Sequence, residues 1–367
     1  MTSTIHFVYV KPDSKPRFDS GIAGAAERLA RRAWKKMSAA AGNGGEASRI
    51  PTPAPYSISA NLHRYLAARC KVRLYDWRER GTIALREDDI LLGHPHPDAD
   101  TLVQQTLRSG ARCRCVALMF PLHHALPEIN AYALPLLDRA DVVLGIMGPY
   151  WYDTLESSFL AQWKEKIVRL DLAVDAAEYP QVKRRFNRPG KRGFLYIGNN
   201  RPEKGTEALS AIFERMGEAP RGWVGGGAEI AHVPRIATYR ALTPEFMEQL
   251  AGTYDIFLNT SVSDANPATI LEAMAWGFPV ACTPQSGYYN IPTITPLSIT
   301  DIDANVATLR ELQHAPDAEL LRLSRANRAL VETHFTWEQF CTTVWRTVEP
   351  YVRNQSEPRT TAARSQR

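Results

Sequence analysis

Short apolar runs separated by helix-length segments are the feature that most constrains the fold of this 367-residue chain. Runs such as Ile5–Val10, Val116–Phe120 and Val142–Ile146 are continuous rather than alternating, which is typical of strands buried on both faces of a parallel sheet. Segments with apolar residues at helical spacing, such as Thr101–Ser109, lie between them. The alternation predicts successive strand–helix–strand units and a mostly parallel sheet.

A second series of the same kind begins near residue 193. Strands are expected at Phe194–Ile197, Ile256–Asn259 and Pro279–Cys282, and a helix at Thr269–Trp276. At about 150 residues per domain, the length of the chain also favours two domains. The sequence therefore predicts two α/β units that repeat one architecture.

Charge divides the chain at nearly the same place. Residues 1–200 carry 29 Lys and Arg against 20 Asp and Glu, whereas residues 201–367 carry 15 against 19. The two halves are expected to meet different partners, unless the basic excess is only a solvated surface. We expect a first domain over residues 1–175, a second over 176–335, a final helix over 336–353 and a disordered polar tail over 354–367.

Several classes of protein are excluded by what the sequence lacks. It has no run of about 18 apolar residues that would predict a membrane-spanning helix, and its N-terminus does not have the basic start of a signal peptide. Cys113 and Cys115 fit no common zinc spacing, and we expect all five cysteines to be free thiols in a reducing compartment. These features predict a cytoplasmic protein without a structural metal. We also expect no cofactor and no nucleic-acid partner.

The segment Ser261–Val280 is the most informative part of the chain. After the strand that ends at Asn259, a loop of small residues leads into a helix that is expected to begin around Pro267. The free N–H groups of such a helix start can bind an anion. Glu272 follows Asp264 by eight positions and can face the same cleft, where a carboxylate suits a diol such as a ribose. The alternative is a capping Asp and a surface Glu.

The strand Phe194–Ile197 leads into a polar loop that contains two basic residues. Arg201 and Lys204 can neutralise a diphosphate, the first as a fork of donors and the second as a point charge. The alternative is a pair of solvated loop charges. A third close-approach site for a ligand is the glycine run at residues 225–227.

The Glu-Lys-Gly of residues 203–205 and the Leu-Glu-Ala-Met-Ala-x-Gly-x-Pro-Val of residues 271–280 resemble the retaining glycosyltransferases of family 4. The resemblance is dense over residues 194–284 and only architectural over residues 1–175. It implies the GT-B fold, in which two Rossmann-like domains face each other across a cleft. It also implies a donor site mainly on the second domain and an acceptor site on the first.

The resemblance assigns roles position by position. Glu272 matches the carboxylate that holds the nucleotide ribose, and Asp264 the one that contacts the donor sugar, although the family has Glu there. The backbone of Ala265, Asn266 and Pro267 would lie against the sugar and the diphosphate. The family often has Gly-Phe in this loop, and Pro267 has no N–H to donate.

The phosphate-binding Lys of the family matches Lys204. Its usual Arg partner would follow Gly198, where this chain has Asn199 instead, and Arg201 is the candidate substitute. In the first half, Gly21 and Gly24 match the glycine-rich turn after the first strand, which lets the backbone approach the phosphate or the acceptor. A His near the sugar would be His123 or His124, although a His in a loop can equally be structural.

His94, His96, Asp98 and Asp100 form a competing cluster that could suggest a metal. Because members of the two-domain plan generally need none, we interpret the histidines as the edge of the cleft. Asp98 and Asp100 are then expected at a helix N-terminus, where the dipole favours acidic residues.

Together these features predict a retaining glycosyltransferase of polysaccharide biosynthesis that moves a sugar from a nucleotide-diphosphate sugar to a glycan or lipid-linked acceptor. The alternatives are a non-catalytic sugar-nucleotide-binding protein and a sugar-nucleotide epimerase of the same fold. A basic segment of the first domain also predicts peripheral contact with an anionic membrane at its cytoplasmic face. Its basic residues are Arg28, Arg31, Arg32, Lys35 and Lys36.

Overall fold

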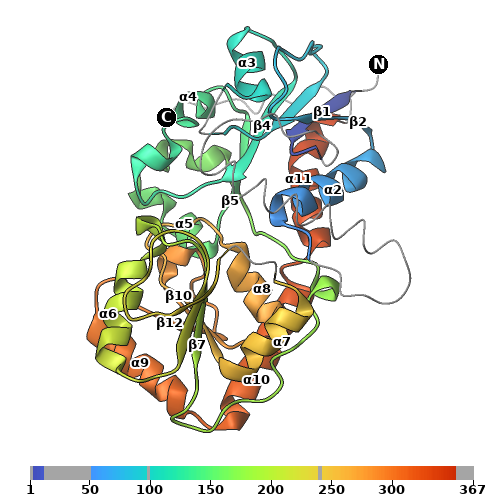
Figure 1. Cartoon of the computed structure of the whole chain (residues 1–367). Helices are drawn as coiled ribbons and strands as arrows, with labels where there is room; N and C mark the ends of the chain where they lie inside the picture. The colour runs from blue at the N-terminus through green and yellow to red at the C-terminus, as the bar shows by residue number, and fades with distance from the viewer. Residues whose placement is uncertain (1–2, 12–50, 97–99, 239–241, 353–367) are drawn as a thin grey trace, which may run out of the picture.

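The computed structural model describes residues 3–11, 51–96, 100–238 and 242–352, which form two α/β units joined end to end (Figure 1). Each unit contains one six-stranded sheet in which every pair of neighbouring strands is parallel. The α/β class and the two-sheet plan expected from the sequence are therefore confirmed. Among the described helices, none is both long enough and apolar enough to cross a bilayer.

The first sheet has the strand order β2-β1-β3-β4-β5-β6. Its middle strands are buried on both faces, as their continuous apolar sequences predict. The strands are β1 (Thr4–Tyr9), β2 (Lys71–Asp76), β3 (Ile90–Gly93), β4 (Cys115–Pro121), β5 (Val142–Ile146) and β6 (Ile167–Leu170). The helices are α2 (Ala54–Ala67), α3 (Leu102–Arg108), α4 (Leu134–Leu137) and α5 (Pro149–Asp153), with 3-10 turns at η1 (Pro127–Asn130), η2 (Leu155–Ser157), η3 (Ala161–Lys166) and η4 (Ala176–Glu178).

The second sheet has the order β12-β11-β10-β7-β8-β9. Its strands are β7 (Phe194–Ile197), β8 (Arg221–Val224), β9 (Arg235–Ala237), β10 (Ile256–Asn259), β11 (Val280–Cys282) and β12 (Ile294–Pro296). Its helices are α6 (Thr206–Met216), α7 (Pro244–Thr253), α8 (Ala268–Trp276), α9 (Ile302–His314) and α10 (Asp317–Thr333), with 3-10 turns at η5 (Pro202–Lys204) and η6 (Pro284–Ser286).

The charged connector between the sheets, residues 175–192, is anchored by two buried basic residues, while its other Lys and Arg residues are exposed. Lys183 and Arg192 are almost completely buried. Lys183 forms an ion pair with the equally buried Asp255 at 2.7 Å, and Arg192 pairs with Asp317 at 2.5 Å. These ion pairs fix the end of the connector to the second unit.

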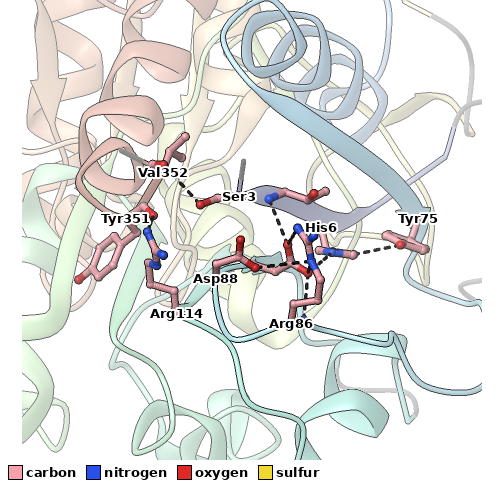
Figure 2. Close-up of polar contacts among 10 residues, drawn as sticks. Ser3, His6, Tyr75, Arg86, Asp88, Arg114, Tyr351 and Val352 are labelled. Atoms are coloured by element: carbon pink, nitrogen blue, oxygen red, sulfur yellow. Dashed lines mark hydrogen bonds and ion pairs between the residues drawn. The ribbon is translucent and has the colours of Figure 1, made fainter. Parts of the chain in front are cut away.

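The last helix, α11 (Trp337–Val352), returns to the first sheet. It lies beside α2 and also contacts β4 and β6 (Figure 1). Tyr65 and Thr342 share a hydrogen bond of 2.9 Å between their hydroxyls. At the end of the helix, the Arg114 guanidinium donates to the carbonyl of Tyr351 at 3.2 Å, beside a buried cluster around His6 (Figure 2). The core of the first unit is thus completed by the end of the described chain.

Candidate functional site

The order of the second sheet reverses between β7 and β10, and this is where the two loops singled out from the sequence lie. Successive strands run outward from β7 through β8 to β9, and the chain then returns to β10 on the other side. In open parallel sheets, ligands bind beyond the carboxyl ends of the strands at such a switch point. The loop after β7 carries Lys204, and the loop after β10 carries Asp264.

Backbone contacts join these two loops. The N–H groups of Val262 and Ser263 donate to the carbonyl of Glu203 at 3.0 and 3.1 Å. Gly205 has a positive φ of 62°, and a Cβ there would lie 1.9 Å from the carbonyl oxygen of Thr260. Only glycine permits this approach, and it places Lys204 directly beside the second loop.

Lys204 and Asp264 form an ion pair at the centre of the site. The Lys204 ammonium donates to the Asp264 carboxylate, with 27% and 14% of the two side chains exposed. The structure thus brings together two residues expected to contact the donor. Since the ammonium is already paired, an incoming phosphate would have to share it with Asp264.

The two candidate histidines after β4 have different surroundings. His124 Nε2 lies 2.9 Å from the Thr154 hydroxyl and 3.2 Å from the Trp151 carbonyl, so its ring is used within the first unit. His123 is buried, which lowers its pKa to about 4, and Coulomb interactions with His124 and Lys204 act in the same direction. Which of the two histidines faces the donor sugar stays a prediction.

His123 is therefore neutral at pH 7. The Ala125 N–H donates to its Nδ1 in a long hydrogen bond of 3.5 Å, which leaves Nε2 to carry the ring proton. A neutral imidazole with that tautomer can donate a hydrogen bond to a hydroxyl without adding charge to the site.

Glu272 lies on α8 but has a different neighbour from Asp264. Its Oε1 accepts a long hydrogen bond of 3.5 Å from the hydroxyl of Tyr179, on the connector. A small cavity beside it is also lined by Thr52 and Ser57 of the first unit. Burial raises the pKa of Glu272 to about 7, although the Tyr179 hydroxyl opposes the shift. The carboxyl thus has an unfavourable environment for its ionised form, which is common at functional sites.

The remaining polar residues of the loop after β7 are mostly structural in this state. The Gly198 carbonyl accepts from the indole of Trp223 at 2.7 Å. The Asn199 side chain accepts from the N–H of Gly226 at 3.2 Å, which ties the loop to the glycine run. Arg201 is half exposed, and its nearest carboxylate, that of Glu203, is 3.7 Å away. Arg201 is thus available to a ligand, and its phosphate role stays a prediction.

The segment between Asp264 and α8 packs against the first unit. The Ala265 carbonyl accepts from the N–H of Gly148 at 2.9 Å. The amide oxygen of the buried Asn266 accepts from the Tyr288 hydroxyl, while its nitrogen has no partner. Pro267 is the N-cap, with extended backbone (φ −66°, ψ 120°), so α8 itself begins at Ala268.

Sequence reasoning missed the part of the first unit that contacts this loop. The segment Gly148–Trp151 follows β5 and begins α5, and the Trp151 indole N–H donates to the Asp264 carbonyl at 2.7 Å. A Gly-Pro pair directly after a buried strand was the available signal for a turn at a sheet edge. Nothing in the sequence indicated which loop it would meet.

Some predicted site residues lie outside the described residues. These are Gly21 and Gly24 of the glycine-rich turn, Asp98, and the basic residues Arg28, Arg31, Arg32, Lys35 and Lys36.

The histidines after β3 are engaged in packing. His96 stacks on Trp77 with ring centroids 4.2 Å apart, and His94 Nδ1 lies 3.1 Å from the Met119 carbonyl. Asp100 pairs with Arg108 of α3, immediately before the N-cap Thr101. Within the described ranges, no three His, Cys, Asp or Glu side chains are grouped as metal ligands.

Comparison with known proteins finds similarity in structure and not in sequence. No protein-family model matches the chain, and no curated protein matches its sequence. Among solved structures, a glycosyltransferase from Rickettsia africae ESF-5 is 12% identical, with a TM-score of 0.54, over 96% of this chain and 99% of that one. A sucrose-phosphate synthase from Thermosynechococcus elongatus is 15% identical, with a TM-score of 0.58, over 95% and 98%.

A third similar structure is a UDP-forming alpha,alpha-trehalose-phosphate synthase from Burkholderia xenovorans in complex with glucose-6-phosphate. It is 12% identical, with a TM-score of 0.54, over 95% of this chain and all of that one. At such identities the likeness shows the fold alone, so membership of family 4 stays a prediction. The chain has the GT-B fold of these glycosyltransferases over nearly its whole length.

Proposed function

We propose that this chain is a retaining glycosyltransferase that uses a nucleotide-diphosphate sugar. The observation that carries the proposal is the Lys204–Asp264 ion pair at the switch point of the second sheet, which Trp151 connects to His123 of the first unit. The Lys204 ammonium can pair with a diphosphate, and the Asp264 carboxylate can accept a hydrogen bond from a sugar hydroxyl. The neutral His123 ring can donate to a second hydroxyl. The GT-B likeness supports the same proposal.

Each residue has a distinct role in this proposal. Glu272 binds the ribose of the donor, and Asp264 contacts the sugar. Lys204, helped by Arg201 and the start of α8, stabilises the negative charge that develops on the leaving diphosphate. The departing diphosphate helps to deprotonate the acceptor hydroxyl, so no side chain has to act as a nucleophile. No metal or cofactor is required.

The acceptor is proposed to be a glycan or a lipid-linked sugar. A sugar phosphate is the second candidate class, because one similar solved structure is described with glucose-6-phosphate bound. A panel of acceptors of the three kinds, assayed with one donor, separates these candidates.

Contact with an anionic membrane is a separate part of the proposal. It rests on the basic segment from Arg28 to Lys36 and on the excess of basic residues in residues 1–200. Co-sedimentation with anionic and neutral vesicles at two salt concentrations tests it. Equal binding to both vesicle types, or none at low salt, contradicts it.

Thermal-shift measurements with a set of nucleotide sugars test the donor site first, since a ligand that binds only the folded state raises Tm. Glu272→Ala should abolish the shift, whereas Lys204→Ala should retain binding and lower kcat by about 100-fold, in the range of a lost charge stabiliser. Lys164→Ala is the matched control, because Lys164 pairs with Glu156 on the surface of the first unit.

The outcomes separate the rival functions. Binding without transfer or donor hydrolysis favours a sugar-nucleotide-binding protein, and release of an epimer favours an epimerase. Wild-type transfer rates in both Glu272→Ala and Lys204→Ala would show that the assigned site is wrong.

A further inference from the structure

Trp151 is a buried residue of the first unit that contacts the Asp264 loop of the second, the segment between β10 and α8. It lies on α5, which Figure 1 shows at the junction of the two units. Only 2% of the residue is exposed, and its indole N–H donates to the carbonyl of Asp264 at 2.7 Å. The contact therefore joins one unit to the backbone of the residue whose carboxylate pairs with Lys204 in the other.

Two further hydrogen bonds dock the same turn on the second unit. The Gly148 N–H donates to the Ala265 carbonyl at 2.9 Å, and the Tyr150 N–H donates to the Gly287 carbonyl at 3.2 Å. A Cβ on Gly148 would lie 2.2 Å from the Gly287 oxygen. The two backbones are thus in direct contact, and a larger residue at position 148 would clash with Gly287.

The Trp151 ring also contacts the two histidines. The ring centroids of His123 and His124 each lie 5.1 Å from it. His124 Nε2 also lies 3.2 Å from the Trp151 carbonyl, which fixes the backbone of α5. One side chain therefore contacts both histidines and the loop that carries Asp264.

We propose that Trp151 is a positioning residue that couples the docking of the two units to the geometry of the Asp264 loop. The expected effect on kcat rests on the proposed function, whereas the coupling between docking and the Asp264 loop does not. The indole N–H satisfies the Asp264 carbonyl only when α5 is docked, so the loop is held in place for Lys204 only in that state. Losing one neutral hydrogen bond of this kind should change the equilibrium between the ordered and the displaced Asp264 loop by about three- to tenfold.

Trp151→Phe tests the coupling, because it keeps an aromatic ring beside the histidines and removes only the N–H. Its matched control is Trp163→Phe, in which another largely buried indole of the first unit loses a hydrogen bond (2.8 Å) to Asp138 of the same unit. Hydrogen exchange of the amides in residues 261–266 should be about three- to tenfold faster in Trp151→Phe than in wild type. It should be unchanged in Trp163→Phe.

A kinetic measurement separates positioning from simple stability. At saturating donor and acceptor, Trp151→Phe should lower kcat by about three- to tenfold and change the KM for the donor less than about twofold. Trp163→Phe should have wild-type values of both constants.

Unchanged exchange in residues 261–266 of Trp151→Phe, or an equal increase in both variants, overturns the coupling. So does a wild-type kcat in Trp151→Phe. A wild-type protein that neither binds nor turns over any nucleotide sugar instead overturns the proposed function, and the exchange result still decides the coupling.

Discussion

Replacing Glu272 by glutamine should stabilise the protein at alkaline pH. Burial raises the pKa of Glu272 to about 7 from its ordinary value of 4.5. The stability that this carboxyl contributes is fully present below pH 4.5 and is lost as the pH rises through 7, because the unfolded chain ionises first. The pKa of Glu272 differs between the folded and unfolded states by about 2.5 units, which corresponds to about 3.4 kcal/mol of free energy of unfolding. About 2.5 kcal/mol of this is lost between pH 5 and pH 8.

Urea unfolding of wild type and Glu272→Gln at pH 5 and at pH 8 measures this effect. The free energy of unfolding of the variant, relative to that of wild type, should rise by about 2.5 kcal/mol from pH 5 to pH 8, since its amide does not titrate. Glu207→Gln, at an exposed position in the first turn of α6, is the control, and its difference from wild type should change by less than about 0.5 kcal/mol. A difference for Glu272→Gln that stays constant, or shrinks as the pH rises, refutes the reasoning.

Three other perturbations test the packing. Lys183→Ala leaves Asp255 buried without its cation and should cost about 3–5 kcal/mol in urea unfolding, and a loss below 1 kcal/mol contradicts it. Gly148→Ala should separate the two units and increase the radius of gyration in X-ray scattering, whereas Gly252→Ala, with open space around its Cβ, should not. Burial lowers the pKa of His94 to about 4. The free energy of unfolding of wild type should therefore fall by about 2 kcal/mol relative to that of His94→Gln from pH 7 to pH 5, and an equal fall in both proteins would contradict this.

Central strands were predictable from sequence, and three of the four edge strands were not. The runs Val142–Ile146, Phe194–Ile197 and Ile256–Asn259 become β5, β7 and β10 with the predicted bounds, because strands covered on both faces must be apolar throughout. The edge strands β6, β9 and β12 are short and partly exposed. Such segments have no periodicity that distinguishes them from loops.

The pairing of Lys204 with Asp264 was within reach of sequence reasoning, and the role of Trp151 was not. Both loops follow strands that meet at one edge of one sheet, so topology alone brings them together. The contact of Trp151 with Asp264 depends on how two separate sheets face each other. That arrangement is decided by packing between units, which leaves no local pattern in the sequence.

The return of α11 to the first sheet has a consequence for synthesis on the ribosome. This helix contributes four buried residues to the hydrophobic core that also contains side chains of the first sheet. They are Phe340, Cys341, Val344 and Val348. A chain elongated at about 5–20 residues per second would therefore wait roughly 10–35 s after Leu170 before its first sheet could be covered. During that interval the second unit can complete its own sheet. We expect ribosome-bound chains that end before α11 to have a protease-resistant second unit and a protease-sensitive first one, the reverse of the usual order.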